Sequence, residues 1–455
     1  MDLDKKSLLA FAARERAAFE RTFQEFVDIP TVSSDPTRQR DIRRCAELAA
    51  QTIRDFGGAP AIIETAGNPI VHGRFDSRPD APTLTVYNHL DVQPASRDTE
   101  PWDSDPFTFT KDGDRYLGRG TTDDKGPALT ALWGIRAARD AGVPLNLRVL
   151  WELEEEIGSP NFEAAMTEHK RKLATDSVVV SDTIWVARNR PACPAGLRGL
   201  AGFELVLKTG ETDQHSGTTG GAARNPIGEL MQLVSEMYDA HTGKVKVKGF
   251  YDDAEQPSKR ELDEFRSSGF SVKKFKADHM FKSLRTEDTI EVMRRIWAMP
   301  TMEVHGLVGG YTGPGIKTII PPHAQVKISC RLVPDQDPKK ILRLMRNFVK
   351  ERNPDVEFIE DTAMYPYKAP ITGPLADAVR GAMKFAFGRE PVFVREGGSI
   401  GAVISMERYL KCPVMFLGLS LPEHGYHAPN ENYDWQQASG GMAAFAKYFE
   451  EVSTL

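Results

Sequence analysis

The stretch TLTVYNHLDVQP, residues 83–94, sets the fold that we expect for this chain. Its first part, Thr83–Asn88, is a short apolar run typical of a buried strand. Similar runs follow at Leu145–Leu150 and Val178–Val180, and a helix is expected between the first two runs, from about Gly126 to Asp140. Strands that alternate with helices are typical of a mostly parallel sheet with helices on both faces. We therefore predict an α/β domain built on such a sheet.

The pattern changes after Gly199, where a second unit begins. Its elements are expected in the order β-α-β-β-α-β, which is the ferredoxin-like arrangement. They lie at Gly202–Lys208, Pro226–Tyr238, Met302–Val308, Gln325–Leu332, Pro338–Val349 and Val356–Ile359. The charged stretch between the first helix and the second strand, residues 241–295, is expected to be irregular.

The α/β alternation resumes from about Lys368. The expected elements are a helix at Leu375–Phe387, a strand at Val392–Val394, a helix after Gly398, a strand at Pro413–Leu417 and a helix at Gln436–Glu450. We therefore predict that residues 1–198 and 368–455 form one domain. Residues 199–367 form an inserted α+β domain.

The composition is that of an ordinary globular protein. Of 455 residues, 40% are hydrophobic, and 58 basic against 64 acidic side chains give a net charge of −6. This chain lacks the basic field that binds nucleic acid, so we expect no nucleic-acid partner. No apolar stretch approaches the roughly 18 residues that span a bilayer, so we expect no membrane segment. The four cysteines form no CxxC pair, which favours a cytoplasmic protein without disulfide bonds.

Carboxylates and imidazoles gather directly after the expected strands or at the start of a helix. They are His89 and Asp91 in NHLDVQP, Asp123 in GRGTTDDKG, Glu155 and Glu156 in ELEEEIGS, Asp182 in VVVSDT and His427 in HGYHAPNEN. Because the carboxyl ends of parallel strands form one crevice, we expect these residues to converge. Taken singly, each has an ordinary explanation as a hydrogen-bonded pair, a solvated acidic run or a cap. Their joint occurrence at successive strand ends favours a functional site.

The residue types at these strand ends predict a metal site. Two imidazoles and several carboxylates without a thiolate suit Zn²⁺, Mn²⁺ or a similar divalent ion. Five ligands are too many for one tetrahedral ion with an open position, but they suit two ions that share a carboxylate. Two ions roughly 3.5–4 Å apart lower the pKa of a bridging water and stabilise a developing oxyanion. We therefore expect hydrolysis.

The motifs resemble one family along nearly the whole chain. The strings NHLDVQP, GRGTTDDKGP, ELEEEIGS, VVVSDT, DQHSGTTGGAARNP, KTIIPP, CRLVP, REGGSI and HAPNEN occur in this order between residues 88 and 432. They are similar to the co-catalytic di-metal peptidases that include aminoacylase, bacterial glutamate carboxypeptidase and carnosinase. The likeness is strongest to the carnosinase and cytosolic non-specific dipeptidase branch, in which the inserted domain is a lid and dimerisation domain.

The resemblance implies a role for each residue of the cluster. His89 and Asp182 would hold one metal, Glu156 and His427 the other, and Asp123 would bridge both. Glu155 would be the general base, with Glu154 pointing away from the metals. Asp91 would orient His89, as ligating imidazoles usually require. A cis peptide bond is expected after Asp123.

The remaining motifs imply substrate handling. His215 would stabilise the oxyanion across a homodimer, and Thr318 would reach the neighbouring active site. Arg331 and the turn at Gly397, Gly398 and Ser399, expected to open a helix, would bind the substrate carboxylate. The alternatives are an exposed lid histidine, a surface ion pair and an ordinary glycine turn.

The resemblance thus implies a cytoplasmic, homodimeric metallopeptidase with two divalent ions, Zn²⁺ or Mn²⁺, that cleaves dipeptides or short peptides with a free carboxylate. Two alternatives remain, an N-acyl-amino-acid deacylase with the same site and a non-catalytic peptide-binding relative. Glu155 argues against the latter. Lys368–Ala376 lacks a histidine that carnosinases carry, which argues against carnosine-like specificity. His424 has no assigned role and is expected on a surface loop.

Overall fold

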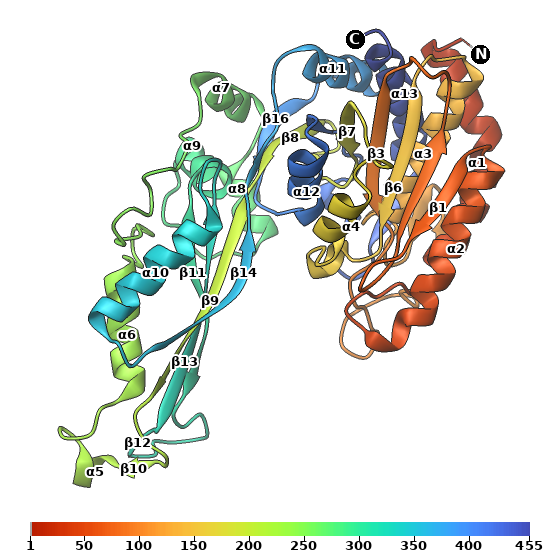
Figure 1. Ribbon diagram of the computed structural model, residues 1–455. Helices are drawn as coiled ribbons and strands as arrows, with labels where there is room; N and C mark the ends of the chain where they lie inside the picture. Colours follow the sequence, from red (N-terminus) through yellow and green to blue (C-terminus); the bar gives the residue numbers. More distant parts are fainter. Residues whose placement is uncertain (1) are drawn as a thin grey trace.

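The computed structural model describes residues 2–455, and its core is a six-stranded sheet (Figure 1). The strands stand in the order β1-β2-β6-β3-β7-β17. Strands β6, β3, β7 and β17 are parallel, and β1 and β2 are antiparallel additions at one edge. Their bounds are β1 Ala59–Ile63, β2 Ile70–Phe75, β3 Thr83–His89, β6 Asn146–Glu152, β7 Ser177–Val180 and β17 Val414–Phe416.

Helices cover both faces of this sheet because its parallel strands are apolar on both sides. In β3, Leu84 and Val86 pack in the cluster formed with α1, α2, α3, α11 and α13, whereas Tyr87 packs in the cluster formed with α4 and α12. The predicted mixed α/β class is thus confirmed. The helices are α1 Lys5–Val27, α2 Gln39–Asp55, α3 Lys125–Asp140, α4 Phe162–Glu168, α11 Pro374–Phe387, α12 Gly401–Leu410 and α13 Trp435–Val452.

Helix α1 illustrates how the sequence builds the outer layer. The Asp4 carboxylate caps the helix by accepting a hydrogen bond from the backbone N–H of Ser7 at 3.0 Å. Phe19, Phe23 and Phe26 recur at helical spacing and are fully buried. Burial of each ring contributes about 1.5–3 kcal/mol. The helix is therefore held mainly by this apolar stripe.

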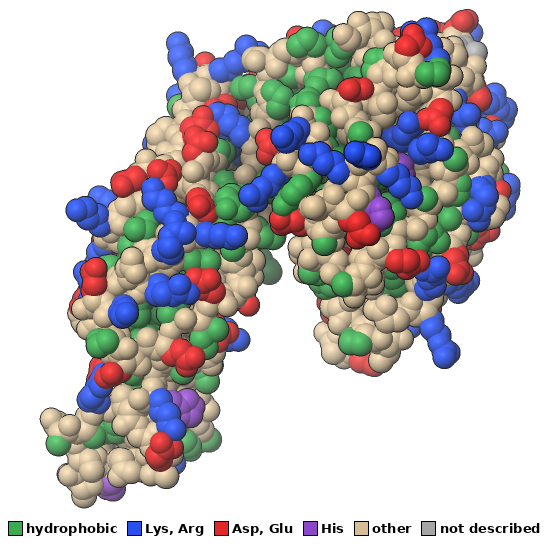
Figure 2. Space-filling view, viewed as in Figure 1, with side chains coloured by type: hydrophobic (Ala, Val, Ile, Leu, Met, Phe, Trp, Pro, Cys, Tyr) green, Lys and Arg blue, Asp and Glu red, His purple; other side chains and the backbone are tan. Residues whose placement is uncertain are grey.

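A second, antiparallel sheet of four strands stands apart from the first, and an open notch separates the two parts (Figures 1 and 2). Its order is β11-β13-β9-β14, and the residues of α6 and α10 share its apolar core. The elements are β9 Gly199–Lys208, α6 Pro226–Met237, β11 Thr301–Gly309, β13 His323–Leu332, α10 Pro338–Arg352 and β14 Glu357–Met364. At its remote end lie β10 Gln214–His215, α5 Ser216–Thr219 and β12 Ile319–Ile320.

Residues 241–295 were expected to be irregular, and this expectation is wrong. The stretch contains α7 Lys259–Ser267, α8 Val272–Asp278 and α9 Thr289–Met293, followed by the short helix η3 Arg294–Ala298. Helix α7 begins at a capping box between Ser258 and Glu261, whose reciprocal hydrogen bonds measure 3.2 and 2.9 Å. Glu261 is also buried and forms an ion pair with Arg395 at 2.6 Å. Helix α7 can therefore pack against the protein despite its charged sequence, because its buried carboxylate, Glu261, is paired with Arg395.

Two small sheets bring distant loops together. Because β18 pairs with β5, Asn432 lies opposite Leu117, which places the loops that follow Leu117 and precede Asn432 side by side. The strands are β4 Thr110–Asp112, β5 Arg115–Leu117, β8 Ala192–Leu197, β15 Tyr367–Lys368, β16 Val392–Glu396 and β18 Asn432–Asp434. Three short helices are η1 Pro36–Arg38, η2 Glu155–Ile157 and η4 Pro422–His424.

Within residues 2–455, no helix combines the length and apolar character needed to cross a membrane. All four cysteines are buried and free. Burial raises the pKa of the Cys45 thiol to about 11, so this side chain stays protonated at neutral pH and packs as an apolar group.

Candidate active site

The carboxyl ends of the parallel strands carry most of the predicted site residues. These are His89 and Asp91 at the end of β3, Glu155 and Glu156 after β6, and Asp182 after β7. Asp123 reaches the same place from the loop before α3, and His427 reaches it from the loop between η4 and β18.

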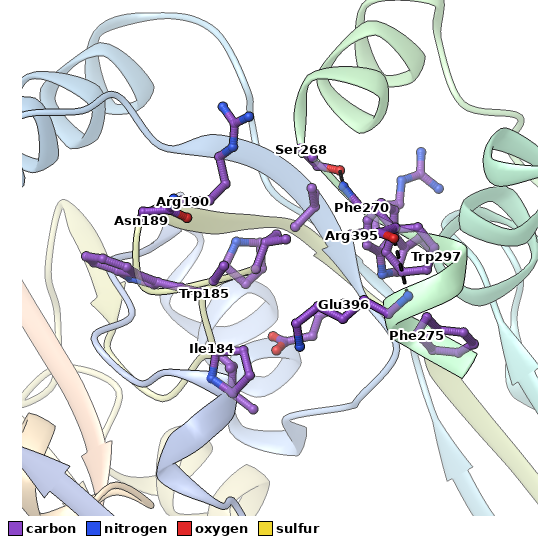
Figure 3. Close-up of a pocket in the computed structure, with 18 of the residues that line it drawn as sticks. Ile184, Trp185, Asn189, Arg190, Ser268, Phe270, Phe275, Trp297, Arg395 and Glu396 are labelled. Carbon is purple, nitrogen blue, oxygen red and sulfur yellow. Dashed lines mark hydrogen bonds between the residues drawn. The ribbon is translucent and has the colours of Figure 1, made fainter. Parts of the chain in front are cut away.

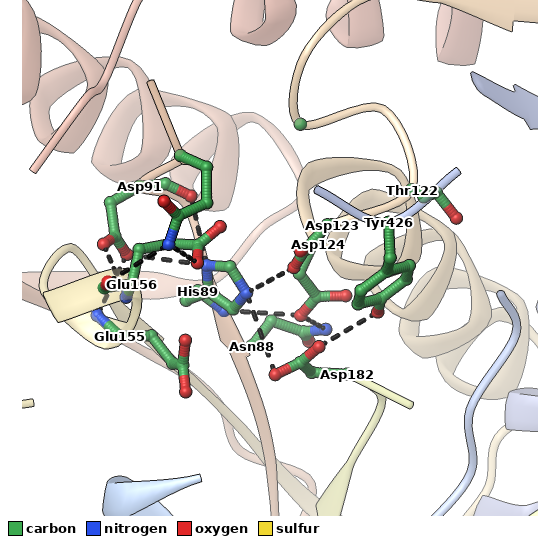
Figure 4. A network of polar contacts seen from close by, with 12 residues as sticks. Asn88, His89, Asp91, Thr122, Asp123, Asp124, Glu155, Glu156, Asp182 and Tyr426 are labelled. Atoms are coloured by element: carbon green, nitrogen blue, oxygen red, sulfur yellow. Dashed lines mark hydrogen bonds and ion pairs between the residues drawn. The ribbon is translucent and has the colours of Figure 1, made fainter. Parts of the chain in front are cut away.

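Asp123 belongs to two groups of potential ligands, and Figure 4 shows it beside His89 and Asp182 of the first group. On one side, His89 Nε2 is 3.0 Å from Asp123 Oδ1 and 3.7 Å from Asp182 Oδ2. On the other, His427 Nε2 is 2.9 Å from Asp123 Oδ2 and 3.1 Å from Glu156 Oε2. In each group the potential ligand atoms lie within 4.8 Å of one another. The structure therefore brings all five predicted ligands together, with Asp123 common to both groups.

Carboxylates outnumber imidazoles in this cluster, and the excess negative charge suits a cation. Burial raises the pKa of Asp182 to about 6 and raises the pKa of Glu155 well above its usual value. Hydrogen bonds to Asp123 and then to Glu156 raise the pKa of His427 to about 10. Buried carboxylates held this close repel one another, and a divalent cation among them would relieve that repulsion. The nitrogen and oxygen donors therefore fit a divalent metal.

Asp91 connects the ends of β3 and β6 (Figure 4). Nδ1 of His89 lies 3.1 Å from the Asp91 carbonyl oxygen and 3.5 Å from Asp91 Oδ1. The Asp91 carboxylate also accepts hydrogen bonds from the backbone N–H groups of Glu155 at 3.2 Å and Glu156 at 3.0 Å. Asp91 therefore fixes both the His89 ring and the turn that carries the two glutamates.

Of the acidic residues next to the predicted site residues, Glu154 points to another part of the protein, as predicted. Its carboxylate accepts hydrogen bonds from the backbone N–H of Asn68 at 2.7 Å and from Asn161 Nδ2 at 2.9 Å, away from the cluster. The Asp123–Asp124 peptide bond is cis. The Asp124 carboxylate belongs to neither group of potential ligands and accepts hydrogen bonds from Asn88 Nδ2 at 2.7 Å and from the backbone N–H of His89 at 3.4 Å.

Two of the residues predicted to bind the substrate carboxylate are in contact. Arg331 Nη1 donates a hydrogen bond to Ser399 Oγ at 3.1 Å, and the Ser399 hydroxyl donates to the carbonyl oxygen of Arg198. Gly397 and Gly398 were expected to open a helix, but α12 begins only at Gly401, after an extended Ile400. Residues 397–399 therefore form a turn that precedes the helix.

His215 and Thr318 lie elsewhere in the chain, at the remote end of the second sheet (Figure 1). The Ser216 N–H donates to the Thr318 carbonyl oxygen at 3.0 Å, so the two residues are neighbours. The His215 side chain is exposed, and its Nδ1 accepts a hydrogen bond from Gly217 N–H at 2.9 Å. Within one chain, the structure does not bring these residues to the other site residues.

Glu431 is a site residue that the sequence analysis did not single out. It is fully buried, and its carboxylate accepts hydrogen bonds from Arg119 Nη1 at 2.8 Å and from the backbone N–H groups of Gly120, Thr122 and Asp123 at 3.0, 2.9 and 3.0 Å. Glu431 thus fixes the loop that carries Asp123. It lies in HAPNEN, but a lone glutamate in a loop gives no signal of such a network.

Two further side chains contact the cluster from within the quoted motifs. The Tyr426 hydroxyl donates to Asp182 Oδ1 at 3.0 Å, and Gln93 Nε2 donates to Glu156 Oε2 at 2.8 Å. Tyr426 directly precedes the predicted ligand His427, and Gln93 follows Asp91 by two residues, so their position next to predicted site residues is the signal that the sequence offers.

His424 was expected on a surface loop, and this expectation is wrong because the side chain is fully buried. Its Nε2 lies 3.1 Å from Asp434 Oδ2, and its Nδ1 accepts a hydrogen bond from the backbone N–H of Leu421 at 3.1 Å. These bonds tie the loop that leads to His427 onto the start of α13.

A cavity of about 410 Å³ lies beside the residues that follow β7 (Figure 3). Glu396 lines it together with Ile184, which follows the predicted ligand Asp182 by two residues. Burial, followed by the charge of Asp182, raises the pKa of Glu396 to about 8. An aromatic wall of this kind suits an apolar side chain. Its rings are Trp185, Phe270, Phe275 and Trp297.

Comparison with known proteins supports a family assignment. The family model described as peptidase family M20/M25/M40 matches residues 85–451. The Beta-Ala-His dipeptidase of Homo sapiens is 27% identical over 460 residues, which cover 96% of this chain and 90% of that protein. A Cys-Gly metallodipeptidase of Candida albicans is 30% identical over 460 residues, which cover 94% of this chain and 93% of that protein.

A solved structure gives the same result. The metallo-carboxypeptidase Sso-CP2 of the M20 family from Sulfolobus solfataricus matches with a TM-score of 0.88 and 29% sequence identity, over 96% of this chain and 99% of that one. These findings confirm the resemblance to the carnosinase and dipeptidase branch that the motifs indicate. The chain belongs to the peptidase family M20/M25/M40.

Proposed function

We propose that the protein hydrolyses the amide bond of dipeptides or short peptides with a free carboxylate, and that it uses two divalent metal ions. The observation that carries this proposal is the position of Asp123, whose two oxygens face two separate groups of ligands. The names of the relatives, dipeptidases and a carboxypeptidase, support the same reaction class.

The two groups of ligands define two metal positions. His89 and Asp182 would hold one ion, Glu156 and His427 the other, and Asp123 both. Zn²⁺ and Mn²⁺ both accept this set of nitrogen and oxygen donors. When bound, the ions supply a water of lowered pKa and stabilise negative charge on the substrate's carbonyl oxygen.

Glu155 is the proposed general base. It neighbours Glu156 but belongs to neither ligand group, so its carboxylate is available to accept a proton from the attacking water and deliver it to the leaving amine. Burial raises the pKa of Glu155, which favours uptake of that proton. Asp91 acts as a positioning residue, because it holds both the His89 ring and the Glu155 backbone.

The substrate carboxylate is proposed to bind at Arg331, Ser399 and the turn formed by Gly397 and Gly398. A guanidinium pairs with a carboxylate through two parallel hydrogen bonds. The contact of Arg331 with Ser399 supports a common site for these residues.

We further propose a homodimer in which residues 199–367 serve as lid and dimerisation domain. Strand β11 is an edge strand that exposes Leu307 and Val308, and the neighbouring helix α6 exposes Met231. An exposed apolar edge of this kind favours pairing with a second chain. The partner subunit's His215 and the partner subunit's Thr318 would then complete the site, and that imidazole would donate a hydrogen bond to the developing oxyanion.

The proposed substrate is a short peptide that is not carnosine-like, and the proposed compartment is the cytoplasm. The named relatives act on Beta-Ala-His and Cys-Gly, but Lys368–Ala376 contains no histidine, which favours a substrate other than a carnosine-like one. The four free cysteines support a cytoplasmic location.

A substrate panel tests this function and separates it from N-acyl-amino-acid deacylation. Purified protein loaded with Zn²⁺ or Mn²⁺ is incubated with a dipeptide library and with matched N-acetyl amino acids, and released amino acids are quantified. We expect dipeptides to be cleaved with higher kcat/KM than the N-acetyl compounds. Cleavage of the N-acetyl compounds alone would assign the deacylase, and cleavage of neither set would contradict hydrolysis.

A further inference from the structure

Two arginines lie on one face at the end of the second sheet. Strands β9 and β13 pair so that Arg331 is opposite Leu200. Arg198 precedes Leu200 by two residues, and side chains two residues apart in an extended chain point to the same face. Such diagonal neighbours on paired strands are about 7–8 Å apart. The side chains of Arg198 and Arg331 are therefore neighbours.

Both arginines also contact the turn at residues 397–399. The backbone N–H of Arg198 donates to the Gly398 carbonyl oxygen at 3.1 Å, and Arg198 Nε donates to the Gly397 carbonyl oxygen at 3.4 Å. A Cβ atom at position 397 would stand 3.2 Å from Arg198 Nη2, so glycine allows the guanidinium to approach this closely. Arg331 reaches the same turn through Ser399.

Neither guanidinium forms an ion pair with any of the acidic side chains that the structure describes. Glu303 on the adjacent strand β11 forms its ion pair with Arg285 instead, at 3.5 Å. Burial, and then the charge of Arg331, lower the pKa of Arg198 to about 10, so both side chains remain cationic at neutral pH. Two partly buried like charges side by side are costly without an anion.

Other buried arginines of the protein do have partners. Arg119 forms an ion pair with Glu431 at 2.8 Å, and Arg395 forms one with Glu261 at 2.6 Å. The pair formed by Arg198 and Arg331 differs from these, and it contacts the turn that directly follows Glu396. Glu396 lines one cavity together with Ile184, which follows the predicted ligand Asp182 by two residues. The two arginines therefore lie on the turn that leads from this cavity.

We propose that Arg198 is a second specificity-determining residue, which binds the substrate's free carboxylate together with Arg331. This inference rests on the proposed function and extends it, because Arg331 is the only arginine to which the sequence motifs point. Two guanidiniums on one carboxylate would make the site reject substrates in which that group is an uncharged amide.

The test compares a free dipeptide with its carboxyl-terminal amide in wild type, Arg198→Met and Arg198→Lys. A merely structural role would lower kcat/KM for both substrates equally, whereas a specificity role lowers the ratio of free to amidated turnover. We expect that ratio to fall by about 10- to 100-fold in Arg198→Met, the range of one charged hydrogen bond. It should fall less in Arg198→Lys, which keeps the charge but not the planar fork. Arg198→Lys also covers the case in which Arg198→Met fails to fold.

Arg408→Met is the matched control, since this exposed arginine lies on the helix after the same turn and stacks 5.8 Å from the ring of Tyr365. The ratio of free to amidated turnover in Arg408→Met should equal that of wild type. If wild type prefers the free dipeptide and both Arg198 variants keep the full ratio, the inference is overturned while the proposed function stands. A wild-type protein that cleaves neither substrate would overturn both.

Discussion

Glu155 and Glu156 are adjacent, yet the structure gives them different surroundings. Glu156 Oε2 lies 3.1 Å from His427 Nε2, whereas Glu155 lies outside both ligand groups. Glu155→Gln should therefore lower kcat by at least ~10²-fold while both metals remain bound. Glu156→Gln should instead weaken metal binding, measured by titration of the metal-free protein. Loss of metal in Glu155→Gln, with full retention in Glu156→Gln, would show that the two roles are exchanged.

Glu431 provides a second test at the scale of single residues. Glu431→Gln removes the charge that pairs with buried Arg119 and disturbs the bonds to the Asp123 loop. Loss of a buried ion-pair partner costs about 3–5 kcal/mol, so the free energy of unfolding of the metal-free protein should fall by this order. Affinity for metal should fall as well.

The matched control for Glu431 is Glu423→Gln, because Glu423 is exposed and forms an ion pair with Arg188 at 2.8 Å. Exposed pairs contribute about 0–1 kcal/mol, so this variant should unfold almost like wild type. If both substitutions change the free energy of unfolding and the metal affinity equally, Glu431 does not hold the Asp123 loop in place.

At the scale of elements, strand β2 buries a histidine that should make the protein acid-sensitive. Burial, and then the charge of Arg148, lower the pKa of His72 to about 3, and its Nδ1 has no hydrogen-bond partner. Below pH 6.5 the unfolded chain binds a proton here that the folded chain does not, so stability falls as pH drops from 6.5 towards 3. The loss is about 2 kcal/mol at pH 5.

Urea unfolding at pH 7.5 and pH 5 tests this dependence. His72→Gln should lose about 2 kcal/mol less stability than wild type between the two conditions, because glutamine does not titrate. His241→Gln, at an exposed position, should behave like wild type. If wild type and His72→Gln lose the same stability between pH 7.5 and pH 5, His72 is not the neutral buried group that causes the acid sensitivity.

The elements also show how far sequence reasoning reaches. Strands such as β3 and β7 were predicted because a buried parallel strand is a continuous apolar run. Helix α7 was missed because its stability depends on the partner of Glu261, Arg395, which is 134 residues away in the chain. Likewise, the strand-end pattern predicted that the imidazoles and carboxylates of the cluster converge, as they do in the structure. The contacts of Glu431 and Arg198 depend on loops that only tertiary structure brings together.

At the scale of the whole molecule, the proposed dimer predicts complementation between two inactive chains. His215→Ala keeps its metals and Glu155, and Glu155→Gln keeps His215 for its neighbour. Each homodimer should be nearly inactive. Random re-association of equal amounts makes half the dimers mixed, each with one complete site of two, so activity should recover to about a quarter of wild type.

Complementation requires that subunits exchange, which gel filtration of differently tagged chains establishes. If exchange occurs and no activity returns, the partner subunit's His215 does not complete the site. The exposed position of His215, remote from the ligands of its own chain, would then need another explanation.

In the proposed mechanism, two metal ions that share Asp123 support the cleavage of short peptides. The most direct measurement determines metal content and dipeptide turnover on the same sample, after complete chelation and at each step of reloading with Zn²⁺ or Mn²⁺. We predict no turnover in the stripped protein, and activity that returns as the metal content approaches two ions per chain. Full turnover after exhaustive metal removal, or full recovery in Asp123→Ala, would contradict a mechanism that needs two metal ions bridged by Asp123.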